Sequence, residues 1–231
     1  MENSDVQIQI KMGKMERNIV NDKYNFAYLT IPKAANSSVK YALLPTISKS
    51  QNDTIHDSPI IQNLHRTDKD LYVYSDKQSV LHKDYSLVFA VVRNSWTRIA
   101  SCYIDKIQHA FHKPFAEYGM SPDTSFSEFV ETIAQIPDDR SEIHFRSQLS
   151  FLFLGDIYLP NLTLKVESLN AQWPIIQSYF HSKYDLRIED MKQICKRGNG
   201  KYADMYDRRT SKLIEQRYSD EIAFFNFSPL S

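Results

Sequence analysis

Two short apolar runs stand out along the chain, and each leads through a polar turn into a helical pattern. The first run covers residues 26–31 and ends at Pro32, which has no N–H to give to a β-ladder. The second covers residues 87–92 and is typical of a parallel strand that is buried on both faces. Helical periodicity follows near residues 38–44 and again from Ser95 onward. This alternation predicts an α/β fold with a central parallel sheet flanked by helices.

Weaker patterns continue the alternation on both sides of these runs. Residues 1–24 are polar and mixed in charge, so we predict an N-terminal extension there and a single domain over residues 25–231. The further predicted elements are a short strand at 71–74 and helices at 126–133 and 173–180.

The turn after the first run has the layout of a phosphate-binding loop. Lys33 contributes a mobile positive charge, Ser37 and Ser38 contribute hydroxyl donors, and a helix N-terminus offers unpaired backbone N–H groups. The loop is not a Walker A motif, because no glycine lies between Lys14 and Gly119. Taken alone, this segment is equally compatible with a lysine at the end of an ordinary βα turn.

The turn after the second run offers a second anion-binding arrangement. Arg93 lies at the C-terminal end of the predicted strand, where ligands bind in open α/β sheets. Ser101 follows eight positions later, about two helical turns at roughly 3.6 residues per turn. A guanidinium group and a hydroxyl group placed in this way can converge on one phosphate. For this segment alone, the alternative is an amphipathic helix capped by Ser95 with a solvated Arg93.

Together the two segments resemble the cofactor loops of sulfotransferases that use 3′-phosphoadenosine-5′-phosphosulfate (PAPS). In the carbohydrate branch of that family the first loop reads like P-K-x-A-x-[ST]-[ST], which residues 32–38 match. The second resembles V-R-[DN]-P-x-x-R-[LI]-x-S-x-[YF], which residues 92–103 match except that Ser95 replaces the proline. Residues 144–148 resemble a weaker H-[WF]-x-x-Q segment of the family. The resemblance covers residues 26–227, but only the two cofactor loops are specific.

The resemblance implies a P-loop-NTPase-like sulfotransferase fold and transfer of a sulfuryl group from PAPS to a carbohydrate hydroxyl by in-line displacement. In that reaction Lys33 would stabilise the charge on the leaving oxygen. Asn36 stands where the family more often has Gly, Ser or Cys, but asparagine can adopt the left-handed conformation that a tight turn needs. The implied cofactor ligands at the 5′ side are Lys33, Ala35, Asn36, Ser37 and Ser38, and those at the 3′-phosphate are Arg93 and Ser101. Arg197 and Lys201 belong to a basic loop that either closes over the 3′-phosphate or is a solvated turn.

The catalytic base should be a histidine or a carboxylate within hydrogen-bond reach of the acceptor. In this branch of the family the base usually comes from the segment between the two phosphate loops. His65 is therefore the first candidate, followed by His56 and His82, although a lone histidine in a polar loop is usually just exposed. His144 has a family-like neighbourhood and either faces the acceptor or braces the fold.

Composition narrows the classes of partner. Lys+Arg and Asp+Glu are equal at 28 each, so no global field favours nucleic acid. Cys102 and Cys195 make no disulfide framework, and the histidines lack metal-ligand spacing, so we predict no metal. The first residues contain no apolar run long enough for a signal peptide or membrane anchor. Because the Golgi members of the family usually start with such an anchor, we expect a soluble, cytoplasmic, bacterial enzyme with no membrane span.

Two other functions remain open at this point. A P-loop kinase-like phosphotransferase is disfavoured because the sequence lacks a Walker A glycine pair and an acidic Mg²⁺ partner. A nucleotide- or glycan-binding module without turnover is disfavoured by the intact motif residues. The acceptor and the oligomeric state are not predicted. Acceptor recognition is expected in the loops at 45–83 and 110–146, whose aromatic residues stack on sugar rings or pack in the core: Phe111, Phe115, Tyr118 and Phe145.

Overall fold

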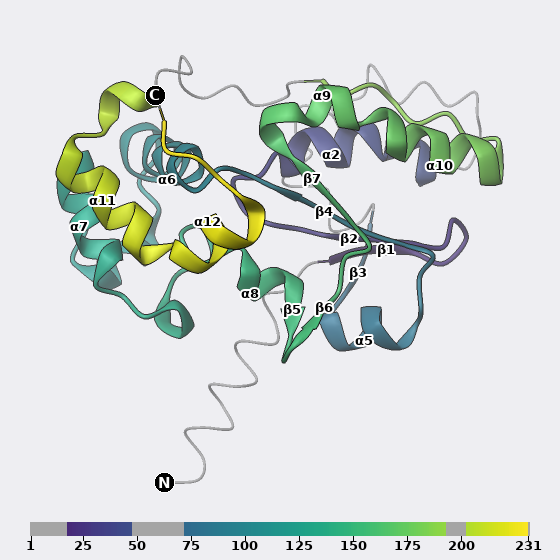
Figure 1. Cartoon of the computed structure of the whole chain (residues 1–231), viewed down its shortest axis with the longest axis horizontal. Coiled ribbons are helices and arrows are strands. Elements are labelled where there is room, and N and C mark those ends of the chain that lie inside the picture. The colour runs from purple at the N-terminus through teal and green to yellow at the C-terminus, as the bar shows by residue number, and fades with distance from the viewer. Residues whose placement is uncertain (1–17, 48–71, 193–201, 231) are drawn as a thin grey trace, which may run out of the picture. The chain divides into compact units, whose positions relative to one another are not determined.

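A computed structural model describes residues 18–47, 72–192 and 202–230 (Figure 1). The chain folds as two compact units, and each of them is discontinuous in sequence. The first unit is drawn from residues 1–31, 35–91 and 151–194, and the second from residues 32–34, 92–150 and 195–231. The single domain predicted over residues 25–231 stays a prediction.

The first unit is built on a five-stranded sheet with the strand order β3-β1-β2-β4-β7. The two predicted apolar runs are confirmed as neighbouring parallel strands, β2 (Phe26–Leu29) and β4 (Leu87–Val92). β1 (Asn18–Asn21) pairs antiparallel with both β2 and β3 (Val73–Ser75), and β7 (Leu162–Lys165) lies beside β4. The α/β class is therefore confirmed, and the sheet also contains antiparallel pairs.

β1 lies inside the segment predicted to be an N-terminal extension over residues 1–24. Its apolar residues Ile19 and Val20 are buried, and Tyr24 just after it packs edge-on against Phe180 with the ring centroids 6.2 Å apart. Two apolar residues between asparagines are too short a pattern to recognise as a strand from sequence. The folded part of the chain therefore begins at or before Asn18, earlier than predicted.

Aromatic side chains join the sheet of the first unit to its helices. α2 (Asn36–Ala42), α9 (Leu169–Gln172) and α10 (Pro174–Tyr184) lie on one face of the sheet, and α5 (Lys77–His82) lies on the other (Figure 1). The core of this unit is a continuous cluster of buried residues from the strands and from α2, α9 and α10, with stacked and edge-on rings at its centre: Phe26, Tyr28, Phe89, Trp173 and Phe180.

The second unit is helical. α6 (Ser95–Tyr103) runs directly into η3 (Ile104–His109), a π-helical turn. α6 packs with α7 (Phe126–Ala134) and α11 (Arg208–Arg217), and α12 (Ser219–Phe225) packs on α11. The remaining described elements of the chain are η1 (Leu44–Thr46), η4 (Lys113–Tyr118), η5 (Asp138–Arg140), α8 (Leu149–Leu152), β5 (Phe153–Leu154), β6 (Ile157–Tyr158), η6 (Val166–Ser168) and η7 (Ala203–Met205).

The start of α6 differs from the prediction that Ser95 caps it. Asn94 is the N-cap residue, and its Oδ1 accepts hydrogen bonds from the backbone N–H groups of Trp96 (3.1 Å) and Thr97 (3.4 Å). Ser95 is the first helical residue, and its hydroxyl donates to the Glu221 carboxylate at 2.7 Å. Asparagine is among the best N-cap residues, so it takes this role and leaves the serine hydroxyl for a tertiary contact.

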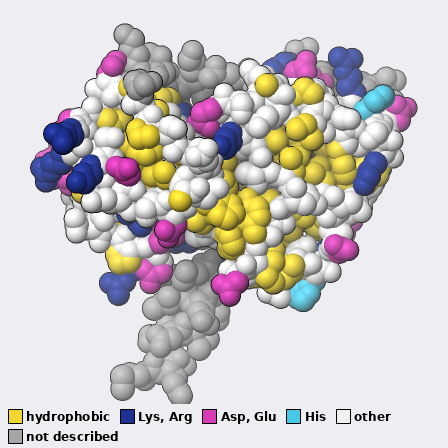
Figure 2. Space-filling model, in the orientation of Figure 1, with side chains coloured by type: hydrophobic (Ala, Val, Ile, Leu, Met, Phe, Trp, Pro, Cys, Tyr) yellow, Lys and Arg dark blue, Asp and Glu magenta, His cyan; other side chains and the backbone are white. Residues whose placement is uncertain are grey.

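Charged side chains of both signs lie on the surface of the chain, whereas Cys102 lies in its interior. Basic and acidic side chains are interspersed on the face drawn in Figure 2, without a large field of one sign. Cys102 is buried, and burial raises the pKa of its thiol to about 12, so it behaves as a small apolar residue. Within residues 18–47, 72–192 and 202–230, no helix is both long and apolar enough to span a bilayer.

Candidate active site

The predicted cofactor residues are divided between the two units. Lys33, Arg93 and Ser101 belong to the second unit, whereas residues 35–38 belong to the first. The loop itself is continuous, so the chain passes from the second unit to the first between Ala34 and Ala35. The lysine and arginine motifs therefore meet in the second unit, and their geometry can be described there.

Two residues of the loop after β2 have a left-handed backbone conformation. These are Lys33, with φ of 69°, and Ala35, with φ of 60°, and not Asn36. Asn36 is the first residue of α2, and its Oδ1 accepts a hydrogen bond from the Tyr28 hydroxyl at 2.6 Å. A side chain in the left-handed region costs roughly 1–2 kcal/mol. Strained backbone of this kind tends to occur at functional sites, where the surrounding structure enforces it.

Two arginines of the second motif hold the turn that carries Lys33. Arg93 Nη1 donates to the carbonyl oxygen of Lys33 at 3.1 Å. Arg98 Nε donates to the carbonyl oxygen of Pro32, the residue just before, also at 3.1 Å. The two motifs that the sequence separates by about sixty positions are thus joined by hydrogen bonds within one unit.

The ammonium group of Lys33 is held by an acidic residue. It lies 3.0 Å from the carboxylate of Asp105, which also pairs with Lys106 at 3.2 Å. The Lys33 and Asp105 side chains are only 14% and 8% exposed, so this pair is much less screened than one on the surface. Asp105 is on the π-helical turn η3, a type of irregularity that is frequent at functional sites.

The region around the turn is locally electropositive, although the chain carries no net charge. Arg98 is completely buried, and among the described residues its Nη1 and Nη2 atoms have no hydrogen-bond partner. A buried guanidinium group with unsatisfied donors favours an anion nearby. Lys33 and Arg93 add positive charge at the same turn, and Asp105 offsets part of it.

The backbone of Arg93 is clamped by a buried glutamine. Arg93 N donates to Gln148 Oε1, and Gln148 Nε2 donates to the Arg93 carbonyl oxygen, both at 2.8 Å. The buried carboxylate of Glu221 accepts in turn from Gln148 N at 2.6 Å and from Gln148 Nε2 at 3.1 Å. The hydroxyl groups of Ser95 and Ser147 also donate to Glu221, at 2.7 and 3.0 Å. A carboxylate on α12 therefore fixes, through Gln148, the residue that follows β4.

The Arg93 side chain is oriented by two further contacts. Its Nε donates to the Thr97 hydroxyl at 3.1 Å, and its guanidinium group lies 5.2 Å from the centre of the Tyr202 ring. Ser101 is 7% exposed and lies two turns into α6, in the same unit. Convergence of Arg93 and Ser101 on one phosphate stays a prediction.

The structure tests few of the base candidates. His65 and His56 lie outside the described residues, as do the predicted cofactor ligands Arg197 and Lys201. His82 is exposed at the end of α5, with its Nε2 2.7 Å from the side-chain amide nitrogen of Gln78.

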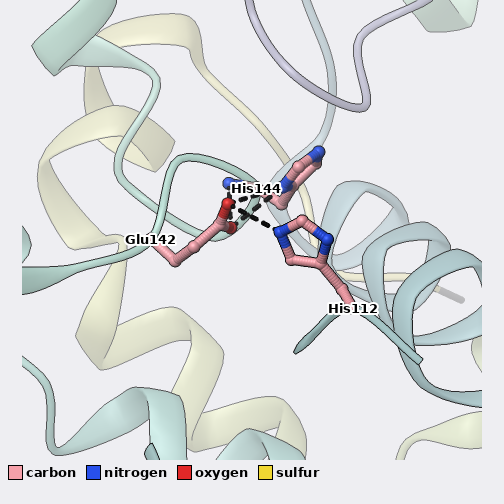
Figure 3. Close-up of side chains that lie close together, drawn as sticks. All are labelled: His112, Glu142 and His144. Carbon is pink, nitrogen blue, oxygen red and sulfur yellow. Dashed lines mark hydrogen bonds and ion pairs between the residues drawn. The ribbon is translucent and has the colours of Figure 1, made fainter. Parts of the chain in front are cut away.

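His144 belongs to a cluster that sequence spacing does not reveal (Figure 3). Its Nδ1 lies 2.9 Å from both carboxylate oxygens of Glu142, and His112 Nε2 lies 3.3 Å from Oε1 of the same group. Burial lowers the pKa of His144. Burial alone would raise the pKa of Glu142, but hydrogen bonds from His144 and the charges of both histidines lower it overall. The fold thus brings together three side chains of types that ligate metals, two histidines and one glutamate, although their spacing in the sequence predicts no metal site.

Several residues that shape the site carry no predicted role. Arg98 and Gln148 both lie inside the motifs quoted above, Arg98 in the motif of Arg93 and Gln148 in the motif of His144. Their place in these motifs is the sequence signal from which a role could have been predicted. Asp105 and Glu221 are charged residues within helical patterns, where the usual expectation is a solvated face. Only the tertiary structure shows that both are buried.

A comparison with protein families agrees with this geometry. Residues 16–228 match the model of the sulfotransferase family. The chain belongs to the sulfotransferase family. The matched range includes both cofactor loops and the Glu221 carboxylate, so it spans the whole network around the Lys33 turn. No curated protein and no solved structure matches this sulfotransferase significantly.

Replacing Ala35 by glycine should stabilise the free protein. Glycine adopts a positive φ without a steric penalty, so Ala35→Gly is expected to raise the free energy of unfolding by about 0.5–1 kcal/mol. The matched control is Ala42→Gly, at a buried helical position of α2, which should lower it by about 1 kcal/mol. Denaturant titration measures both, and a loss of stability in Ala35→Gly would contradict the assigned strain.

Removing the glutamine clamp should weaken the site. Gln148→Leu keeps the approximate side-chain volume but removes the hydrogen-bond partners of the Arg93 N–H and carbonyl groups and one donor to the Glu221 carboxylate. The free energy of unfolding should fall by about 2–4 kcal/mol. The control Gln135→Leu changes an exposed glutamine in the same unit and should change stability by less than about 0.5 kcal/mol. Equal denaturation midpoints for the two variants would show that the clamp contributes nothing.

Proposed function

We propose that this sulfotransferase transfers the sulfuryl group of PAPS to a hydroxyl group of a carbohydrate acceptor. The observation that carries the proposal is the meeting of Lys33 and Arg93 at one electropositive turn in a chain of the sulfotransferase family. The local surplus of positive charge, with the unsatisfied donors of Arg98, suits a ligand that carries several phosphate charges.

The proposed roles follow the two motifs. Lys33 would stabilise the charge that develops on the oxygen between the sulfuryl group and the 5′-phosphate. Arg93 and Ser101 would hold the 3′-phosphate, with Arg197 and Lys201 as further candidates from the basic loop. The 5′-phosphate would be held by backbone and side-chain donors of Ala35, Asn36, Ser37 and Ser38.

Positioning accounts for most of the proposed catalysis. Sulfuryl transfer needs the acceptor oxygen, the sulfur and the leaving oxygen in line, so a fixed Lys33 matters more than a mobile one. Asp105 is a positioning residue for Lys33, because the pair restricts the ammonium group to one side of the turn. No step of this scheme uses a metal.

A histidine is proposed to take the proton from the acceptor hydroxyl group. His65 is the first candidate, with His56, His82 and His144 as alternatives. Two of the aromatic residues considered for sugar stacking are core residues instead, because Phe115 and Phe145 are fully buried and pack against each other. Phe111 and Tyr118 are partly exposed and stay candidates for acceptor binding. The expectation of a soluble cytoplasmic bacterial enzyme also stays a prediction.

Binding of the product nucleotide, 3′-phosphoadenosine-5′-phosphate, tests the donor. Calorimetric titration without magnesium should give micromolar binding, and ADP should bind at least about tenfold more weakly because it lacks the 3′-phosphate. Arg93→Ala should lower the affinity for the product nucleotide by about 10–100-fold. The control Arg209→Ala removes an exposed arginine of the same unit and should leave the affinity for the product nucleotide unchanged.

The other outcomes of this titration are also informative. Equal affinity for ADP, or a requirement for magnesium, would favour the kinase-like alternative. Binding without any turnover, on a panel of glycan acceptors, would favour a binding module.

Substitution of Lys33 tests the chemical step. Lys33→Ala should lower kcat for sulfation of a glycan by about 10²–10³-fold, with a smaller loss of nucleotide affinity. The control Lys113→Ala removes an exposed lysine of the same unit. In the same assay His65→Ala should lower kcat with nucleotide affinity intact. His181→Ala removes an exposed histidine that is not a candidate base and should leave kcat unchanged. An unchanged kcat in Lys33→Ala refutes its proposed role.

A further inference from the structure

His112 and Glu142 have no role in the transfer reaction proposed above, and His144, which lies beside them, enters it only as an alternative base. We infer that these three side chains form a binding site for a divalent transition-metal ion of the zinc type. The inference does not depend on the identity of the donor or the acceptor.

The donor atoms converge on one point. One ring nitrogen of each histidine and a carboxylate oxygen of Glu142 all lie within 4.8 Å of one another, and in Figure 3 both rings turn a nitrogen toward the carboxylate. Zinc bonds of about 2.0–2.1 Å place tetrahedral donors about 3.3 Å apart. The distances from the carboxylate to the two imidazole nitrogens, 2.9 and 3.3 Å, are already close to that value.

The donor set selects the class of metal. Two imidazole nitrogens and one carboxylate are a known ligand set for zinc and for other first-row divalent ions, whereas magnesium and calcium prefer oxygen donors throughout. Three protein ligands leave at least one coordination position for water or an oxygen ligand. The partial exposure of the side chains, 28% for His112, 11% for Glu142 and 17% for His144, gives an ion access to the site.

The scaffold holds the donors in place before a metal binds. Phe115 and Phe145 are fully buried, and their rings meet edge-on at 5.6 Å, which joins the segment of His112 to the segment of His144. The His112 ring lies edge-on to Phe115 at 5.3 Å. The Glu142 carbonyl accepts hydrogen bonds from the backbone of Phe145 and Arg146, so the loop makes a tight turn there. Such support around the ligands is what fixes their orientation in metal sites.

Charge around the cluster is compatible with a cation. Glu142 supplies one negative charge, which a divalent ion would neutralise in part. Lys106 acts on His144 with an opposing positive charge, but it is paired with the Asp105 carboxylate at 3.2 Å. Because Asp105 is shared with Lys33, the charge of Lys106 is compensated only in part, and the Glu142 carboxylate is the negative group that would offset a cation at the cluster.

The test is metal binding to the full chain, in a Cys195→Ser background so that this thiol does not contribute. After treatment with a chelator and desalting, Zn²⁺ should titrate calorimetrically to one ion per chain. Substitution by Co²⁺ should give the visible absorption of a nitrogen- and oxygen-ligated ion. His112→Ala and His144→Ala should each lower the affinity for Zn²⁺ by more than about 100-fold, and Glu142→Gln should lower it by at least about tenfold.

His109→Ala is the matched control, because His109 is an exposed histidine in the same unit, and it should bind Zn²⁺ like the unmodified protein. Circular dichroism shows whether each variant is folded, and the conservative Glu142→Gln keeps the test valid if an alanine variant does not fold. Absence of stoichiometric Zn²⁺ binding, or equal binding in Glu142→Gln and the unmodified protein, would overturn the inference and leave a hydrogen-bonded cluster. Nucleotide binding measured on the same samples reports separately on the proposed function.

Discussion

The conformation of the turn that carries Lys33 depends on hydrogen bonds from two guanidinium groups to two consecutive carbonyl groups. Arg98 binds the carbonyl of Pro32, and Arg93 binds that of Lys33. A hydrogen bond from a charged donor contributes about 1.5–3 kcal/mol. This is comparable to the cost of roughly 1–2 kcal/mol of a left-handed lysine, so the arginines can offset the strain that the turn contains. The turn is therefore a tertiary structure and not a local one.

Two of the cationic residues at this turn, Lys33 and Arg93, are supported by an acidic or amide group. Asp105 fixes the Lys33 ammonium group, Gln148 fixes the backbone of Arg93, and Glu221 fixes Gln148. Such a network holds positive charge in place without reorganisation when a ligand binds, which is the condition for effective electrostatic stabilisation. It also explains how a protein with no net charge can concentrate positive charge at one place.

The parts that could be predicted from sequence are those in which the signal is local. The apolar runs of β2 and β4 are confirmed, because strands buried on both faces need continuous hydrophobic residues. Lys33 and Arg93 follow these strands directly, so their motifs could be recognised. β1 could not be predicted, because it is buried by the neighbouring strands and its own short sequence has no recognisable strand pattern. Gathering His112 with Glu142 and His144 requires chain segments thirty residues apart to meet, which spacing alone does not encode.

The position of Glu221 near the end of the sequence has a consequence for how the site comes into being. The turn with Lys33 is synthesised early, and the helix with Arg98 follows, but the carboxylate that anchors Gln148 leaves the ribosome only after residue 221 has been added. A nascent chain that already contains both phosphate motifs therefore still lacks a fixed Arg93. The network around the Lys33 turn is therefore complete only at the end of translation, and a shortened translation product without α12 would keep both motifs and lose the carboxylate that fixes Arg93 through Gln148.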